Sequence, residues 1–265
     1  MERIIGIFLV VLILPAMACR LGEAIIGETV IGSGEVASEL RPVNDISSVN
    51  LATTGTLYIE TGDREELRIE AENNLLPYIV TEMSGNRLSI DTKQGVSIQK
   101  TKPINYYLTV IDLEAISISS SGDINAPAFT TDNFRISISS SGDLKIESLE
   151  VDQLNVDISS SGDMTLGRLD AELINVSISS SGDLLVLEGY IEQQRINMSS
   201  SGSYDAKDVA SSEVNAKLSS SGSVTIRVND LLEASLSSSG DIYYIGDPVL
   251  DVRTSSSGRV IQIDE

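Results

Sequence analysis

The chain has 265 residues, of which 41% are hydrophobic and only 4% aromatic, and its formal net charge is -21. It contains no His and a single Cys, which excludes Ser-His-Asp and Cys-His catalytic sites and His-ligated zinc or iron sites. The strong negative charge excludes nucleic acid as a default partner, because binding to phosphates requires Lys and Arg.

The first residues have the layout of a secretory signal peptide. Met1-Glu2-Arg3 is followed by a mostly aliphatic run over residues 4–14 and then by Pro15-Ala16-Met17-Ala18-Cys19. The apolar run is shorter than the roughly 20 residues that span a bilayer, and its charged start and small-residue end are typical of secretion. We therefore expect a signal peptide over residues 1–18, followed by a tether and entry segment over residues 19–40.

Cys19 directly follows Ala18 and resembles the modified residue of bacterial lipoprotein signals. The resemblance implies that Cys19 becomes the lipidated first residue of the mature protein, which would anchor it in a membrane of the cell envelope, outside the cytoplasm. Ala16 stands where that motif usually has Leu, and an ordinary signal peptide or an uncleaved anchor stays open as the alternative. Without a second Cys, no disulfide is expected in the mature fold.

A degenerate repeat and a non-repeating insert come next in the chain. Residues 49–57 align with residues 116–124, so Gly55 occupies the position of Gly122. The insert over residues 58–115 is predicted to form antiparallel strands over 67–71, 78–83, 87–91 and 104–111, with a turn at 84–86 and at most a short helical turn within 72–77. We expect the insert to act as a cap, because an open strand edge invites pairing with other chains.

Residues 116–265 repeat with a fixed period. Ser-Ser-Ser-Gly occurs eight times, and successive copies are 20 residues apart five times and then 18 residues apart twice. Apolar residues stand six and four positions before each glycine and two and four positions after it, a spacing typical of strands with one buried face. A fixed period of this length predicts a solenoid. Each turn, or rung, should hold one strand before the Ser-Ser-Ser-Gly corner, one after it and a looser third side. The predicted fold is therefore an all-β, right-handed parallel β-helix within a single domain over residues 41–265.

The corners carry the residues that we single out as architectural. The corner glycines are expected to need a positive φ, which glycine reaches without a Cβ penalty; they are Gly55, Gly122, Gly142, Gly162, Gly182, Gly202, Gly222, Gly240 and Gly258. Alternation places the middle serine of each triplet inward, which predicts a buried hydroxyl ladder bonded to neighbouring serines or carbonyls. Its members are Ser120, Ser140, Ser160, Ser180, Ser200, Ser220, Ser238 and Ser256.

An aspartate follows the glycine on several consecutive rungs. Stacked carboxylates could collect Ca²⁺, which prefers several oxygen ligands; the candidate ladder is Asp123, Asp143, Asp163 and Asp183. Turn capping explains the same residues without an ion, and carboxylates one rung apart in water repel by only about 1 kcal/mol. We therefore expect no metal, no cofactor and no catalytic residue in this chain.

Several short motifs outside the corners resemble the family described as putative auto-transporter adhesin, head GIN domain. They are residues 32–36 (Gly-Ser-Gly-Glu-Val), 41–43 (Arg-Pro-Val), 74–79 (Asn-Leu-Leu-Pro-Tyr-Ile), 93–96 and 101–104 (Thr-Lys-Pro-Ile), together with the Ser-Gly-Asp corners. The resemblance covers residues 32–265. It implies a β-helix with an N-terminal antiparallel part on a secreted or envelope protein, and it brings no established binding or catalytic residues.

These observations support three functions. The first is a non-enzymatic, lipid-anchored envelope protein whose acidic solenoid serves adhesion or scaffolding through an unidentified extracellular or envelope ligand. The second is a carboxylate-based enzyme acting on polysaccharides, since parallel β-helices host such activities. The third is self-assembly through the last rung, which no sequence is left to cap, and where Arg253 and Arg259 are expected to face acidic rungs such as that of Asp241.

Overall fold

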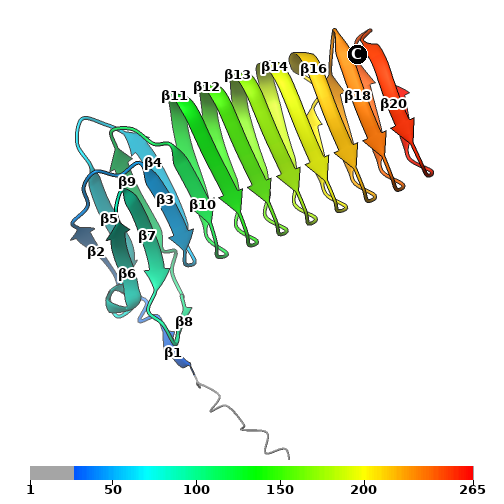
Figure 1. The fold of residues 1–265 in the computed structure, drawn as a ribbon. Coiled ribbons are helices and arrows are strands. Elements are labelled where there is room, and N and C mark those ends of the chain that lie inside the picture. The colour runs from blue at the N-terminus through cyan, green and yellow to red at the C-terminus, as the bar shows by residue number, and fades with distance from the viewer. Residues whose placement is uncertain (1–26, 265) are drawn as a thin grey trace, which may run out of the picture.

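Stacked parallel coils make up most of the structure, a computed structural model that describes residues 27–264 (Figure 1). A smaller group of strands lies at the N-terminal end of the stack, and the last described residues lie at the far end. Cys19 and the predicted signal peptide lie outside the described residues. The eight Ser-Ser-Ser-Gly corners delimit about seven turns, which confirms the solenoid.

Long strands form the first regular rungs, and shorter ones form the later rungs. The long strands are β11 (Asp123–Ile138), β12 (Leu144–Ile158), β13 (Met164–Ile178) and β14 (Leu184–Met198). The later rungs are built from β15 (Ser203–Ala206), β16 (Val209–Leu218), β17 (Ser223–Arg227), β18 (Leu231–Leu236), β19 (Asp241–Ile245), β20 (Val249–Thr254) and β21 (Arg259–Gln262). Each strand pairs in parallel with its equivalent one period away, as Ile136 does with Val156.

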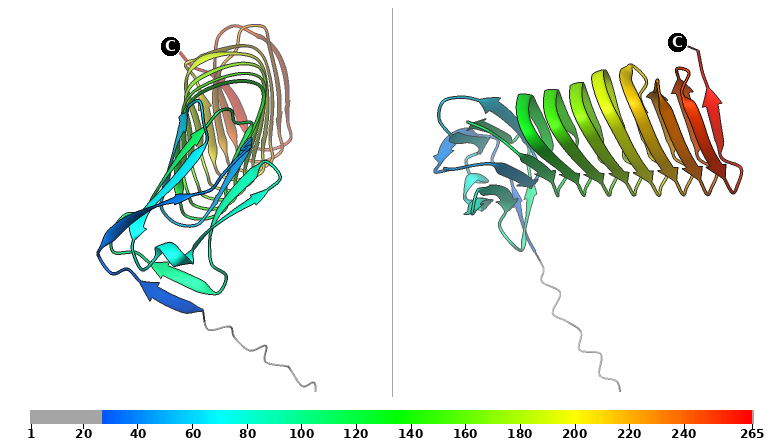
Figure 2. Two further views of the ribbon diagram at one scale, coloured as in Figure 1. Left: turned by 90° about the vertical axis from the view of Figure 1, so that its left-hand side faces the viewer. Right: turned by 45° about the horizontal axis from the view of Figure 1, so that its top comes forward.

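The third side of each rung is more regular than the expected looser connection. In β12 buried and exposed residues alternate, but the alternation shifts by one position after Ile146 and again after Val151. Leu149 and Leu154 therefore also point into the core. Strand pairing skips one residue at each of these two bends, at Glu147 and Asp152. The end-on view in Figure 2 shows the resulting flattened coils in line with one another. The rung is thus one bent strand closed by one corner.

Close approach of the backbone, and not a positive φ, explains the glycine at each regular corner. Among the corner glycines only Gly55 has a positive φ, of 120°, so the sequence-based explanation is wrong for the other eight. A Cβ added to Gly162 would lie 2.6 Å from the carbonyl oxygen of Ser140 and closer still to that of Gly142. Every corner from Gly142 onward meets the preceding corner in this way. Any larger residue would push two rungs apart.

The expected buried serine ladder is only half-buried, because the glycine occupies the inward place at the corner. The middle serines from Ser120 to Ser238 are partly exposed, and Ser256 is exposed. Their bonding follows the expectation at several rungs, since the hydroxyls of Ser140, Ser160 and Ser200 donate to the carbonyl of the middle serine one rung before. The serine column therefore ties neighbouring corners together at the surface and not within the core.

The degenerate repeat forms a ninth corner, in register with the regular ones. Strand β3 (Ser48–Ala52) pairs in parallel with β10 (Ala115–Ile118), and β4 (Thr56–Thr61) pairs with the start of β11. The register places Leu51 beside Ile118 and Leu57 beside Ile124, as the sequence alignment predicts.

The insert combines antiparallel and parallel pairing. Strands β5 (Glu66–Glu72), β6 (Ile79–Ser84), β7 (Arg87–Thr92) and β9 (Asn105–Val110), with the short 3₁₀ turn η1 (Leu76–Tyr78), occupy the expected places. β5 pairs antiparallel with β9, and β6 with β7. However, β7 and β9 also pair in parallel with β3 and β4. The insert therefore continues the coil by one partial rung before it closes the stack.

Three further strands complete the N-terminal end. β2 (Val36–Arg41) lies antiparallel to β5, and β1 (Glu28–Ile31) lies parallel to β8 (Val96–Gln99) in a separate two-stranded sheet. The loop of Gly32, Ser33 and Gly34 connects β1 to β2 and lies against the end of β5.

A buried carboxylate holds this loop in place. Glu72 is fully buried and accepts hydrogen bonds from the amides of Gly34 (2.6 Å), Thr101 (2.8 Å) and Lys102 (3.1 Å) and from the Thr101 hydroxyl (2.5 Å). A Cβ on Gly32 would overlap the carboxylate. Burial acts to raise the pKa of Glu72, but these four donors outweigh it and hold the pKa at about 2. Two motifs that carry the family resemblance, at 32–34 and 101–102, thus meet at one side chain.

The corner packing predicts the effect of adding a single methyl group. Gly162→Ala should lower the free energy of unfolding by about 1–3 kcal/mol. The added methyl group would overlap the carbonyl oxygens of Ser140 and Gly142 on the preceding rung, which cannot move without separating the two rungs. Ser161→Ala, at the exposed neighbouring position, is the matched control and should change little. Urea unfolding followed by circular dichroism measures both. Equal stability of the two variants would contradict the close-approach explanation.

The geometry around Glu72 predicts a pH-dependent loss of stability. Ionised Glu72 contributes stability above its ordinary pKa of 4.5, and this contribution disappears as the pH falls toward 2. Glu72→Gln should therefore be less stable than the native chain at pH 7, and the difference should shrink between pH 4.5 and pH 2. Thermal unfolding across this range measures it, with the exposed Glu82→Gln as control. A difference that does not vary with pH would refute the assignment.

Candidate functional site

The aspartate column, the first candidate site, connects the rungs through backbone amides. The Oδ1 atom of Asp123 accepts a hydrogen bond from the amide of Asp143 (3.1 Å), and Asp143 and Asp163 do the same for the next rung (3.0 Å each). Asp183 accepts from both the amide (2.7 Å) and the hydroxyl (2.8 Å) of Ser203. The carboxylates thus cap the following rung and not their own turn.

The amide of the residue after each corner glycine donates to a different acceptor wherever the preceding rung lacks an aspartate. The amides of Asp123, Ser223 and Asp241 follow rungs with Thr or Ser at this position, and they donate to the carbonyls of Gly55 (2.9 Å), Gly202 (3.2 Å) and Gly222 (3.2 Å). Asp241 restores the carboxylate pattern and accepts from the amide of Arg259 (3.1 Å). The aspartates therefore have a structural reason that requires no ion.

No group of three or more His, Cys, Asp or Glu side chains suited to hold a metal ion occurs within residues 27–264.

The side chain of Arg259 reaches back to Asp241, with Nη2 2.6 Å from Oδ2, as expected for an arginine facing that rung. This hydrogen bond and ion pair lower the pKa of Asp241. Arg253 pairs instead with Asp251 on its own strand, at 3.1 Å.

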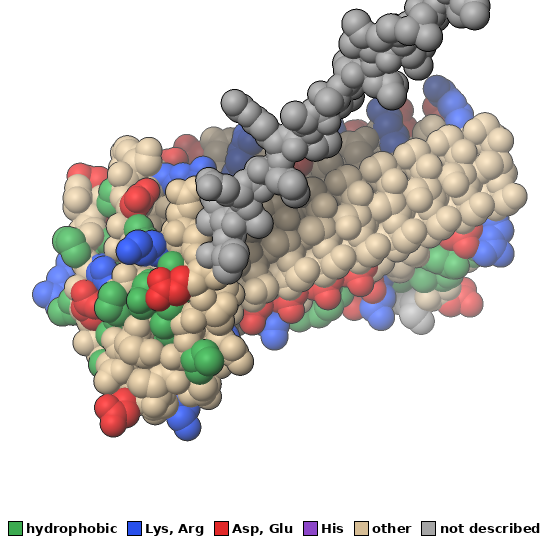
Figure 3. Space-filling model, turned by 90° about the horizontal axis from the view of Figure 1, so that it is seen from below, with side chains coloured by type: hydrophobic (Ala, Val, Ile, Leu, Met, Phe, Trp, Pro, Cys, Tyr) green, Lys and Arg blue, Asp and Glu red, His purple; other side chains and the backbone are tan. Residues whose placement is uncertain are grey.

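The serine corners form a broad neutral face. The outer serines of each triplet, such as Ser139 and Ser141, are exposed along the whole stack. Figure 3 views the molecule from the corner side and shows this band without apolar or charged side chains, with acidic side chains along one border. This face provides hydroxyl groups at a regular spacing, and a hollow of about 220 Å³ at its border is lined in part by Ser199, Ser219 and Ser237.

A groove with a volume of about 840 Å³ lies over β11 to β14, on the part of the rung away from the corners. Its floor includes the backbone at Val151 and Ala171, whose nearly buried side chains point toward the core. One wall is a column in register, formed by Thr130, Glu150, Asp170 and Tyr190. The other wall follows the second bend of each rung and contains Asp132, Asp152, Glu172 and Glu192.

Negative charge dominates this groove, which we call the acidic groove. Six of its lining residues are Asp or Glu, and none is Lys or Arg. Asp132, Glu150, Asp152 and Glu172 form no ion pair within the part of the chain that the structure describes, and all four are exposed. Exposed carboxylates on adjacent rungs repel one another weakly in water, and a cation placed beside them would relieve this repulsion.

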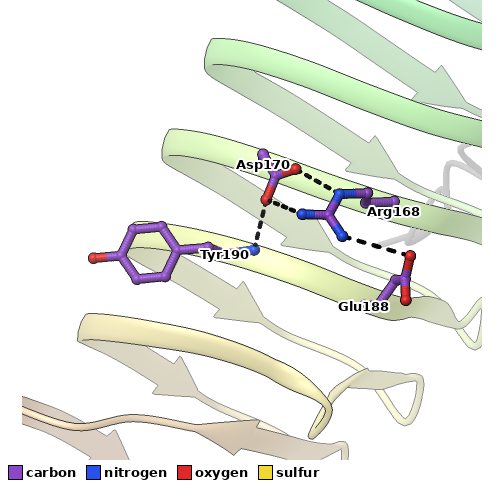
Figure 4. A network of polar contacts seen from close by, with 4 residues as sticks. All are labelled: Arg168, Asp170, Glu188 and Tyr190. Atoms are coloured by element: carbon purple, nitrogen blue, oxygen red, sulfur yellow. Dashed lines mark hydrogen bonds and ion pairs between the residues drawn. The ribbon is translucent and has the colours of Figure 1, made fainter.

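One end of the acidic groove is fixed by a polar network (Figure 4). Arg168 binds both oxygens of Asp170, at 2.7 and 3.2 Å, and its Nη1 lies 3.6 Å from Glu188. The hydrogen bonds and charge of Asp170 raise the pKa of Arg168. The Tyr190 amide donates to Asp170 (3.1 Å), and the Tyr190 hydroxyl donates to Glu192, which raises the pKa of Tyr190. The exposed ring of Tyr190 is thereby held at the rim.

The sequence-based interpretation did not single out the acidic groove. Its signal was an acidic residue ten positions after the glycine on four consecutive rungs, at 132, 152, 172 and 192.

Cys19 lies outside the described residues, so its predicted lipidation stays a prediction. No helix within residues 27–264 has the length and the apolar character required to cross a membrane.

Comparison with known proteins places the fold among solved bacterial structures. A putative adhesin from Parabacteroides distasonis aligns with a TM-score of 0.83 at 23% identity and covers 89% of this chain and all of its own. A putative adhesin from Parabacteroides merdae gives a TM-score of 0.78 at 22% identity, over 90% of this chain and all of its own. A putative lipid binding protein from Parabacteroides distasonis gives 0.76 at 22% identity, over 89% and 100%.

No curated protein matches the chain. A family model does match it, over residues 46–168 and again over residues 160–248. Together the two matches cover the degenerate repeat, the insert and most of the regular rungs, which is more than half of the sequence. The chain therefore belongs to the family described as putative auto-transporter adhesin, head GIN domain.

Proposed function

We propose that this protein is a non-enzymatic binding module of the cell envelope, and that the acidic groove contacts a cationic partner. The groove is the observation that carries the proposal: six carboxylates from four rungs line it, and no basic residue does. The description of the family and the names of the structural neighbours, two of them putative adhesins, support a role in binding.

The arrangement of the carboxylates argues against the alternative of a polysaccharide-cleaving enzyme. A catalytic general acid needs an environment that keeps one carboxyl group protonated, which usually means an apolar pocket. The unpaired carboxylates of the acidic groove are exposed, and those on adjacent rungs lie in open columns. Such columns suit contact with an extended chain, because the same charge recurs at every rung.

A Lys- or Arg-rich polypeptide segment fits this groove best. An extended chain laid across the rungs can place its cations against the carboxylates of both columns. The rim ring of Tyr190 adds a surface for cation–π contact. Because the contacts are exposed, added salt should weaken binding.

A charge-neutralising variant tests the groove. Glu150→Gln combined with Asp152→Asn should weaken the binding of a decalysine peptide about two- to thirtyfold, since exposed ion pairs contribute about 0.2–1 kcal/mol each. Calorimetric titration measures the dissociation constant. Glu147→Gln combined with Asp157→Asn, which removes two charges from exposed positions of the same strand outside the groove, is the matched control.

Two results would contradict the proposed groove. One is a decalysine affinity that falls equally in the control and in the groove variant, which would indicate attraction to net charge alone. The other is cleavage of a glycan by the purified protein that either groove substitution abolishes, which would favour the enzyme.

The envelope location rests on Cys19 and has its own test. We expect the native chain to partition with membranes through a lipid on Cys19, and Cys19→Ala to lose both the lipid and the membrane association. Cell fractionation, combined with incorporation of a labelled fatty acid, measures this. A Cys19→Ala chain that stays in the membrane fraction would instead indicate an uncleaved apolar anchor.

A further inference from the structure

The last rung leaves its inward residues open to solvent. Leu250 and Val252 are 46% and 39% exposed, whereas their register partners one rung earlier, Leu232 and Ala234, are 0% and 3% exposed. The difference arises because β20 covers β18, while within residues 27–264 β20 pairs only on that side. The opposite end of the stack is closed by the N-terminal strands.

We propose that β20 pairs antiparallel with β20 of a second copy of this chain, which joins two solenoids tail to tail. The pairing would extend the sheet across a two-fold axis and cover Leu250 and Val252 with their equivalents. A two-fold contact uses the same strand edge in both copies, so this pairing ends at a dimer and does not continue into a fibre.

The charges on β20 select one register for this pairing. Residues directly opposite each other in an antiparallel pair lie on the same face, so inward residues must face inward residues. In a symmetric pair this requires one residue to lie opposite its own equivalent, next to the two-fold axis. With Val252 on the axis, Asp251 lies opposite Arg253 of the second copy, and this contact occurs twice. With Asp251 or Arg253 on the axis, the same residue would face itself and like charges would meet.

The outward side chains are already placed for this contact. Asp251 and Arg253 lie on one face of β20, 3.1 Å apart, and both are exposed, at 49% and 79% of their side-chain surface. Leu250 would face Thr254 of the second copy on the inner side. One strand thus combines an apolar inner face with a self-complementary outer face.

A charge-swap series tests the proposal on the purified full chain. Light scattering over a concentration series should show a dimer for the native chain. Arg253→Asp and Asp251→Arg should each weaken dimerisation at least tenfold, because like charges would then meet across the axis. The double variant that carries both changes should restore it, and Asp157→Arg on the side of the rod should leave it unchanged.

A cross-linking experiment gives an independent readout. Residues on the axis of an antiparallel pair have Cα atoms roughly 4.5–5.5 Å apart, within the range that a disulfide bridges. In a Cys19→Ser background, Val252→Cys should form a covalent dimer on oxidation, and Ala234→Cys, covered by β20, should not. A native chain that stays monomeric, a double swap that fails to restore the dimer, or assembly beyond two copies would overturn the proposal.

Discussion

Contact between the glycine backbone of one corner and the carbonyls of the preceding corner sets the distance between rungs. The inward place at each corner has room for a hydrogen atom and no more, since a methyl group at Gly142, Gly162 or Gly182 would overlap the carbonyl oxygens of the rung before. Because every rung repeats this contact, the strands stay within hydrogen-bonding distance and the aliphatic columns stay closed. The serine carbonyls and hydroxyls then bind across the same short gap.

The residue that follows each corner glycine is explained by the hydrogen bonds that backbone amides need. The amide that follows each corner glycine must find an acceptor, and an aspartate on the preceding rung supplies one at four consecutive steps. Where Ser or Thr stands in its place, the glycine carbonyl accepts instead. A column of like charges that resembles an ion-binding ladder in the sequence is therefore part of the hydrogen bonding of the coil.

Much of this fold could be predicted from the sequence, because its period makes distant residues equivalent. The strands flanking the corner, the ninth corner at Gly55 and the strands of the insert all follow from spacing by two and by twenty. The third side was missed because two bends shift the inward parity after Ile146 and Val151, and no Gly or Pro marks them in that rung. The buried Glu72 was missed for another reason: its donors, at 34 and 101–102, lie outside the repeat and far apart in sequence. The acidic groove lies at the second of these bends, where outward residues two apart, such as Glu150 and Asp152, form two neighbouring columns.

The parallel pairing of β1 with β8 has a mechanical consequence. A pull on residue 27 along the strand would load the four paired positions from Glu28–Val96 to Ile31–Gln99 together, in shear, and not one after another. Behind that sheet, the carboxylate of Glu72 fastens the next loop to residues 101 and 102. A force applied at residue 27 must therefore break the β1–β8 pairing and then the Glu72 hydrogen bonds before it acts on the first coil.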